Sequence, residues 1–515
     1  MNYLTYSGNN LVNISLPEGS TIFYAPPTRA GLSRAEIPAA VKRAFESPVD
    51  MPPIKSLVDG NTKLLICFDD NCQPFPPTPR PDIRQLMLEA LLPMLYEAGV
   101  NKSNIRLMCA VALHRKMKRH ELEYMVGSRI MSEFYPAQLE NFDAEDQPNI
   151  ANLGETDRGE PVEVSRHAVE ADLVIYLDSI QIPLNGGHKS VAVGLGTYRT
   201  IAAHHSPHMT KDTPHVMQPE GSCMHESIER ISRVVSKHAK IMVLEAAMNN
   251  ATYPAAFTHL GIPDADCNFF QRTIKTLTPP SLSLTPEPLR RKIFTSIKGD
   301  YSPMEMNAGS IDGVHPKTIA ALKRQMVVDA PRQYDTLVFG LPDLSPYAID
   351  ARINPVLVLS DVLGYIFNWF YNKPLIRKGG SVVIINPVFE VFHPEYHTAY
   401  EQFWREVLPS TTDPMEMHQR FQQKFAEDPK LIDDYRNKFA HHGFHPFTVW
   451  YWATYPLKYL SQVVLVGPKD DRVAKRLGVK WAANTDAALE MCKQGKNHDV
   501  AALTLPPFFY LNVHG

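Results

Sequence analysis

Residues 63–71 read KLLICFDDN, an apolar run that ends in a polar turn. Such a run predicts a buried β-strand over Lys63–Phe68, with Asp69 and Asp70 at its carboxyl end. Asp82–Ala98 follows with apolar side chains at helical spacing, and Ile105–Ala112 is the next predicted strand. A strand, a helix and a second strand in this order predict a parallel sheet, with functional side chains at the carboxyl ends of its strands.

The same alternation continues along the rest of the chain. Further strands are predicted at Asp172–Leu177, Tyr334–Gly340, Gly380–Pro387, Gln462–Val466 and Gly478–Ala482, and further helices at His315–Gln325, Arg352–Phe370, Asp470–Leu477 and Thr485–Lys493. Residues 270–310 contain proline clusters and predict a loop-rich linker. We therefore expect an α/β fold of two domains with largely parallel sheets. Residues 1–295 would bind a cofactor, and residues 296–515 would close over the site, so that a cleft for cofactor and substrate lies between them.

Composition and charge limit the kinds of partner. The chain has 515 residues, 44% hydrophobic and 21% charged, with a net charge of −3, so it has no overall basic field to attract nucleic acid or anionic lipid. No apolar run reaches the 18 residues of a membrane span, and the first residues lack the pattern of a signal peptide. The six cysteines match no zinc motif, which is typical of free thiols in a reducing compartment. We expect a cytoplasmic protein that binds a small molecule and neither nucleic acid nor a membrane.

A candidate site begins at residues 186–189, GGHK, and continues to His205, sixteen residues after Lys189. Paired glycines let backbone amides approach an anion such as phosphate, because they have no Cβ. The lysine adds an amine and the histidine adds a metal ligand, so the segment indicates a cofactor site. A glycine turn before a surface lysine is the alternative that this segment alone leaves open.

These motifs, in this order, resemble the lactate racemase family, whose members carry a nickel-pincer nucleotide. The resemblance covers most of the chain, although each motif is short. It rests on FDD at 68–70, His114, GGHK at 186–189, His205, GVHP at 313–316 and KRLG at 475–478. It implies a racemase or epimerase of a 2-hydroxy acid or a related hydroxylated substrate, which works by reversible hydride transfer.

The resemblance also implies roles for single residues. Lys189 corresponds to the family lysine that holds the cofactor through a thioamide, and Gly186 and Gly187 would help to bind it. His205 corresponds to the nickel ligand, a role that suits imidazole. His114 corresponds to a general acid/base, for which a histidine has a suitable pKa.

Two further residues correspond to family positions at the cofactor. Asp70 matches an aspartate of the cofactor loop, and its simpler interpretation is a turn-capping residue. Trp450 matches a tryptophan that lines the site from the second domain, and its alternative is a core aromatic. The tract HHGFH at 441–445 precedes Trp450 and either caps the aromatic helix or contributes polar contacts to the cleft.

The sequence departs from the family where the substrate would bind. Gln73 takes the place of an arginine that grips the substrate carboxylate, and it can form hydrogen bonds but cannot neutralise that charge. The family's second catalytic histidine has no counterpart before Lys189, and His188 is the nearest substitute. Leu357 and Ser360 replace a substrate-binding glutamine and lysine. Because the cofactor residues persist while the carboxylate-binding residues are gone, we expect a substrate other than lactate.

Two other functions stay open. His204 and His205 with Asp69 and Asp70 would bind zinc or manganese in a hydrolase, although no paired-ligand motif supports this. The second alternative is a non-catalytic homologue that binds a nucleotide or a sugar acid. The oligomeric state is left open.

Overall fold

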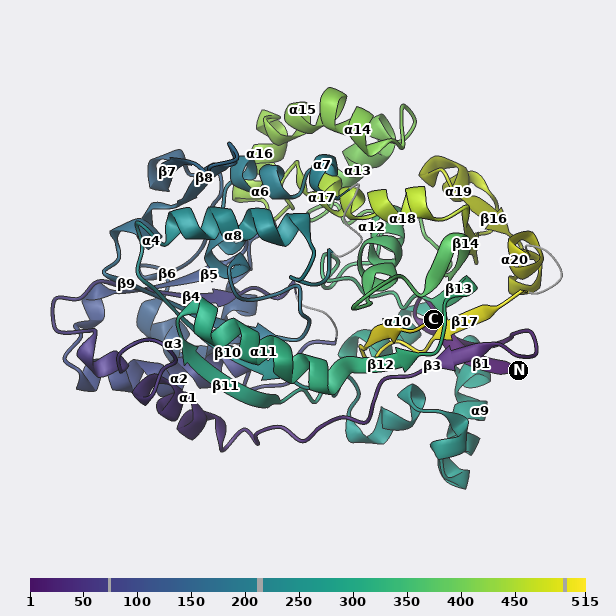
Figure 1. Ribbon diagram of the computed structural model, residues 1–515, viewed down its shortest axis with the longest axis horizontal. Coiled ribbons are helices and arrows are strands. Elements are labelled where there is room, and N and C mark those ends of the chain that lie inside the picture. Colours follow the sequence, from purple (N-terminus) through teal and green to yellow (C-terminus); the bar gives the residue numbers. More distant parts are fainter. Residues whose placement is uncertain (73–75, 211–215, 494–497) are drawn as a thin grey trace.

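The computed structural model describes residues 1–72, 76–210, 216–493 and 498–515, and these residues form two six-stranded sheets (Figure 1). The first sheet has the order β11-β10-β9-β4-β5-β6, and its neighbouring strands are parallel except β10 and β11. Its strands are β4 (Leu64–Asp69), β5 (Ile105–Ala110), β6 (Leu139–Asn141), β9 (Leu173–Ile180), β10 (Ile241–Met248) and β11 (Pro303–Gly309).

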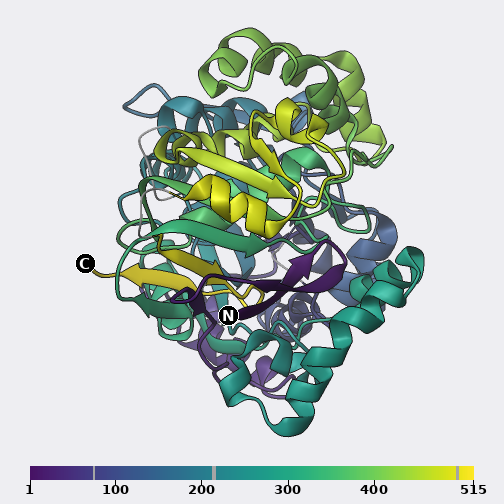
Figure 2. The ribbon, with the colours of Figure 1, turned by 90° about the vertical axis from the view of Figure 1, so that its right-hand side faces the viewer.

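The second sheet has the order β16-β15-β14-β13-β17-β3, with all neighbours parallel. Its strands are β3 (Thr21–Phe23), β13 (Tyr334–Gly340), β14 (Ile376–Ile385), β15 (Gln462–Val466), β16 (Lys480–Ala482) and β17 (Val500–Leu503). Three two-stranded sheets pair β1 (Asn2–Ser7) with β2 (Asn10–Ser15), β7 (Ile150–Glu155) with β8 (Pro161–Ser165), and β12 (Val327–Ala330) with β18 (Tyr510–Val513). Figure 2 shows the β1–β2 hairpin (purple) beside the C-terminal strands (yellow).

Helices connect and cover these strands. In the first part of the chain they are α1 (Ile37–Glu46), α2 (Ile83–Glu97), α3 (Arg119–Phe134), α4 (Arg166–Glu170), α5 (Lys189–Gly194), α6 (Tyr198–His204), α7 (Pro207–Thr210), α8 (Cys223–Val235), α9 (Phe269–Leu284), α10 (Glu287–Ser296) and α11 (Ile311–Met326). In the second part they are α12 (Pro355–Ser360), α13 (Thr398–Gln402), α14 (Pro414–Met417), α15 (Gln423–Ala426), α16 (Pro429–Asn437), α17 (His445–Trp452), α18 (Thr454–Tyr459), α19 (Arg472–Leu477) and α20 (Thr485–Cys492). None of the helices in the described ranges has both the length and the hydropathy of a membrane span.

The predicted α/β fold with largely parallel sheets is confirmed. The division at residues 295 and 296 stays a prediction, and two strands cross it. β3 lies before this boundary but pairs with β17 of the second sheet, whereas β11 lies after it but pairs with β10 of the first. The chain therefore contributes β3 to the second sheet, then forms the first sheet, and then completes the second sheet with β13 to β17.

The predicted linker over residues 270–310 is wrong, because these residues form α9, α10 and β11. The proline clusters indicated loops, but two local features allow helices. Asn268 and Gln271 form a capping box that satisfies backbone amides at the start of α9. Pro288 lies in the first turn of α10, where a missing N–H costs no helical hydrogen bond.

Candidate functional site

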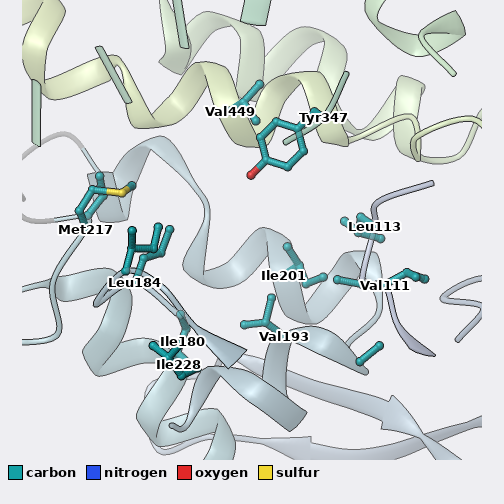
Figure 3. Close-up of a cluster of buried hydrophobic side chains, with 14 of the residues drawn as sticks. Val111, Leu113, Ile180, Leu184, Val193, Ile201, Met217, Ile228, Tyr347 and Val449 are labelled. Carbon is teal, nitrogen blue, oxygen red and sulfur yellow. The ribbon is translucent and has the colours of Figure 1, made fainter. Parts of the chain in front are cut away.

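A cavity lies at the carboxyl ends of β4, β5 and β9, and residues from the second half of the chain complete its wall. Its polar lining includes Asp70, His114, Lys189 and His205 from the first half, and Tyr347 and His445 from the second. Figure 3 shows Tyr347 of the second half above the layer that carries Val193 and Ile201 of the first half. The structure thus brings three residues predicted as base, tether and metal ligand into one cavity between the two halves.

Asp70 and His114 form a hydrogen-bonded pair. Asp70 is buried, and its Oδ2 lies 2.8 Å from His114 Nδ1. Its Oδ1 accepts a hydrogen bond of 2.8 Å from the backbone N–H of Cys72, which fixes the turn after β4. Because Nδ1 of His114 is engaged by the carboxylate, Nε2 is the ring nitrogen left for proton transfer.

Lys189 is the first residue of α5, and its amine lines the cavity. Its Nζ donates a hydrogen bond of 3.2 Å to Asn185 Oδ1. Burial lowers the pKa of the Lys189 amine to about 8, although the carboxylates of Asp69, Asp70 and Asp178 oppose this shift. About a tenth of such an amine is neutral at pH 7, and the neutral amine is the nucleophilic form.

This lowered pKa predicts how Lys189 reacts with an amine-specific reagent. The amine is protonated and unreactive below its pKa, so labelling by acetic anhydride should rise with a midpoint near pH 8. The labelling of an ordinary lysine amine should have its midpoint at about pH 10.4. Peptide mass spectrometry measures both profiles, with the exposed Lys317 as the reference. Identical profiles for the two lysines would contradict a buried, perturbed amine.

His205 is a buried neutral imidazole. Its Nδ1 lies 2.5 Å from Nδ1 of His204, which leaves Nε2 as its other ring nitrogen. Burial holds the pKa of His205 well below its usual range, and the neighbouring His204 and Lys189 lower it further. Nε2 of His204 is buried without a hydrogen-bond partner among the described residues. A neutral imidazole oriented by a second residue has the form that metal ligation requires.

The two glycines pack against the side chains of Glu245 and His315, which form a hydrogen-bonded pair. Gly187 has a φ of +60°, and a Cβ there would come within 2.6 Å of the His315 ring. Its backbone N–H donates a hydrogen bond of 2.7 Å to Glu245 Oε1, and His315 Nδ1 lies 3.0 Å from the same oxygen. The Gly187 amide therefore already binds a carboxylate, which corrects the expectation that it holds a cofactor phosphate. Gly186, in contrast, does line the cavity.

His188 and Trp450 lie away from the cavity, which corrects two further expectations. His188 Nδ1 lies 3.0 Å from Ser232 Oγ, and its Nε2 lies 3.2 Å from Asp312 Oδ1. Consecutive side chains in this turn diverge, so that Lys189 faces the cavity and His188 faces α8. Trp450 is fully buried, and its indole N–H donates to the carbonyl oxygen of Thr412.

The cavity-facing side of α17 consists of His445, Thr448 and Trp452, which follow helical spacing. Trp450 lies on another side of the same helix and packs against Phe403. The helix that carries Trp450 therefore lines the cavity, but it does so with Trp452 rather than with Trp450. Gln73, the predicted substrate-binding residue, lies outside the described residues.

His445 and Tyr347 are site residues that sequence reasoning did not assign. The His445 ring centre lies 5.2 Å from that of His114, and its Nδ1 lies 2.7 Å from the Tyr400 hydroxyl. Burial, together with the neighbouring His114, holds the pKa of His445 well below its usual range. The HHGFH tract indicated polar contacts in the cleft, and the position of Tyr347 shortly after β13 was an available signal.

Two buried carboxyl groups lie beside the lysine. Asp178 lines the cavity, and its Oδ2 accepts a hydrogen bond of 2.7 Å from Ser190 Oγ. Burial and the neighbouring Asp69 raise the pKa of Asp178 well above its usual range. The raised pKa favours the protonated form of Asp178, which reduces the negative charge around Lys189.

Fold and site define an α/β protein of two six-stranded sheets, with acid–base, amine and imidazole groups in a cavity lined from both halves of the chain. Residues 7–217 match the family model described as the lactate racemase N-terminal domain. The lactate racemase of Thermoanaerobacterium thermosaccharolyticum is 26% identical over 177 residues, which are 33% of this chain and 39% of that protein. The lactate racemase of Lactiplantibacillus plantarum is 25% identical over 205 residues, 39% of this chain and 45% of that protein. The matches thus span less than half the length of these relatives.

Solved structures extend the likeness of fold to the whole chain. The lactate racemase apoprotein of T. thermosaccharolyticum has a TM-score of 0.63 at 16% identity, covering 99% of this chain and 100% of that one. A protein from Thermotoga maritima has a TM-score of 0.54 at 12% identity, covering 95% and 100%. The N-terminal match thus relates residues 7–217 to the lactate racemase N-terminal domain, and the solved structures show that the likeness of fold continues over the rest of the chain.

Proposed function

We propose that the protein is an isomerase, a racemase or epimerase of a hydroxylated substrate other than lactate, dependent on a nickel-pincer nucleotide. The observation that carries this proposal is the convergence of His114, Lys189 and His205 in one cavity. The family match over residues 7–217 includes all three.

The residues present fit such a cofactor. Lys189 offers a partly neutral amine for a covalent link, and His205 offers a neutral imidazole for nickel. His204, with an unpartnered buried Nε2, is positioned to orient His205. When bound, this cofactor would supply reversible hydride transfer at the substrate carbon.

The side chains around the substrate would move its proton. Asp70 holds Nδ1 of His114, so that Nε2 takes the proton of the substrate hydroxyl and later returns it. His445 contributes a second imidazole from the other half of the chain, close to His114. A racemase must bind both enantiomers of its substrate. Two imidazoles in one cavity would allow one of them to take the hydroxyl proton from each enantiomer. The two halves would exclude water from the reacting carbon.

The test is to express the chain with and without the enzymes that make the cofactor. Loaded protein should carry stoichiometric nickel and a mass increase on the peptide that contains Lys189. It should interconvert the enantiomers of a 2-hydroxy acid, followed by chiral chromatography. Substrate deuterated at the reacting carbon should retain that deuterium in the product, because a hydride returns to the carbon that lost it. Loss of the deuterium to solvent, or absence of the adduct, would contradict the proposal.

A second candidate is a divalent-metal enzyme. The side chains that favour it differ from the two histidines and two aspartates that the sequence suggested. Ligand atoms of Asp70, Cys72 and His114 lie within 4.8 Å of one another. A carboxylate, a thiolate and an imidazole suit zinc. Stoichiometric zinc that is lost in Cys72→Ser, with no adduct on Lys189, would favour this function over the first.

A further inference from the structure

A second cavity adjoins the first. Pro346 and Tyr365 line both of them, so the two spaces share a wall. At this wall the hydroxyl groups of Tyr347 and Tyr365 lie 2.5 Å apart. The second cavity therefore lies directly beside the proposed reaction site, within the second half of the chain, with Pro346 and Tyr365 between the two spaces.

The walls of the second cavity are almost entirely apolar. Leucine, isoleucine, proline and aromatic side chains form most of them, among them Leu344, Ile366, Phe508 and Pro506. Such walls favour an aliphatic or aromatic group and give no counter-charge to a second carboxylate or a phosphate.

Two polar groups in this lining have an unsatisfied atom. Asp361 Oδ1 and Trp369 Nε1 are both buried and have no hydrogen-bond partner among the described residues. Asp361 is only 6% exposed. Burial raises the pKa of its carboxyl well above the usual range, against a hydrogen bond from Ser345. A protonated carboxyl and an indole N–H are both donors, and buried donors without partners indicate an acceptor supplied by a ligand.

We propose that this second cavity receives the side chain of the substrate, an apolar group with an oxygen acceptor at its far end. The inference rests on the proposed function, because it takes the first cavity as the place where the hydroxyl-bearing carbon reacts. The substrate class is then a 2-hydroxy acid with an aromatic or similar side chain that carries a phenolic or carbonyl oxygen. Asp361 and Trp369 select for this oxygen, and the apolar walls select for the group that carries it.

The test compares three probes: lactate, 3-phenyllactate and 3-(4-hydroxyphenyl)lactate. Calorimetry on the purified protein gives their affinities, and kcat/KM of the loaded enzyme gives a second readout. The phenyl group should improve binding over lactate by at least about tenfold, because it buries apolar area. The phenolic oxygen should improve it by about tenfold again, because it satisfies buried donors.

Variants separate the contribution of the apolar walls from that of the buried hydrogen-bond donors. Asp361→Leu should abolish the preference for the phenol over the phenyl group, whereas Asp361→Asn, which keeps an N–H donor, should retain part of it. Leu344→Trp should fill the cavity and weaken both aromatic probes without affecting lactate. Ile349→Trp is the matched control, because Ile349 is similarly half-buried on the same segment but does not line this cavity. Thermal unfolding shows whether each variant is folded.

Each failure has a distinct meaning. Equal affinity for lactate and the aromatic probes, or an unchanged preference in folded Leu344→Trp, would overturn the subsite. The calorimetric result does not need the adduct, so a missing mass increase on Lys189 contradicts the proposed function alone. A loaded racemase without aromatic preference contradicts the subsite alone.

Discussion

Lys189→Ala should lose the covalent adduct, the nickel and all measurable turnover. The hydride chemistry belongs to the cofactor, so kcat of an enzyme that cannot hold the cofactor should fall by at least about 10⁴-fold. Lys189→Arg should behave in the same way, because a guanidinium keeps the positive charge but is not a nucleophile at neutral pH. Intact-mass spectrometry, nickel analysis and the chiral assay measure the three effects on protein expressed with the cofactor-making enzymes.

The fold of these variants is not expected to change. Lys189 donates one hydrogen bond, to Asn185, and its amine is destabilised by burial. The exposed Lys317→Ala serves as the control and should keep the adduct and full activity. Nickel content and turnover that survive in Lys189→Ala would show that the cofactor, if present, is held elsewhere, and the role proposed for Lys189 would have to be abandoned.

Local sequence patterns predicted the strands and several of the helices well. The apolar run at Lys63–Phe68 became β4, displaced by one residue, and Tyr334–Gly340 and Gln462–Val466 became β13 and β15 with the predicted bounds. These strands are buried on both faces of a parallel sheet, so their apolar runs are unbroken. The topology rule then located His114 and Lys189 near the same edge. The carboxyl ends of parallel strands meet there, whatever their separation in sequence.

The direction of single side chains was not predictable in this way. His188 and Lys189 are neighbours, yet the backbone between Gly186 and Gly187, both at positive φ, sends them to different sides. Whether His445 or Trp450 faces the cavity depends on the rotation of α17, which is buried on all sides and so has no amphipathic pattern to reveal it. Contacts made by the full tertiary fold determine these orientations.

His114→Ala should lower kcat by about 10²–10⁴-fold, the usual contribution of a general acid/base. The reason is that His114 is the imidazole in the cavity that a carboxylate orients, with Nδ1 held 2.8 Å from Asp70 Oδ2. Nickel content and the adduct on Lys189 should be unchanged, since His114 holds neither. Added imidazole should restore part of the rate if the lost group transfers a proton. Activity is measured by chiral chromatography on loaded protein.

Two further variants test the same mechanism. Asp70→Asn should lower kcat by less than His114→Ala does, about 10–100-fold. The amide still contacts the imidazole but no longer stabilises its protonated form. His238→Ala, on an exposed histidine, should have no effect. If His445 is the base for the opposite enantiomer, His114→Ala and His445→Ala should each slow the conversion of a different enantiomer to the carbonyl compound in a single half-reaction. A His114→Ala enzyme of full activity would leave proton transfer to His445, and would remove the Asp70–His114 pair from the mechanism.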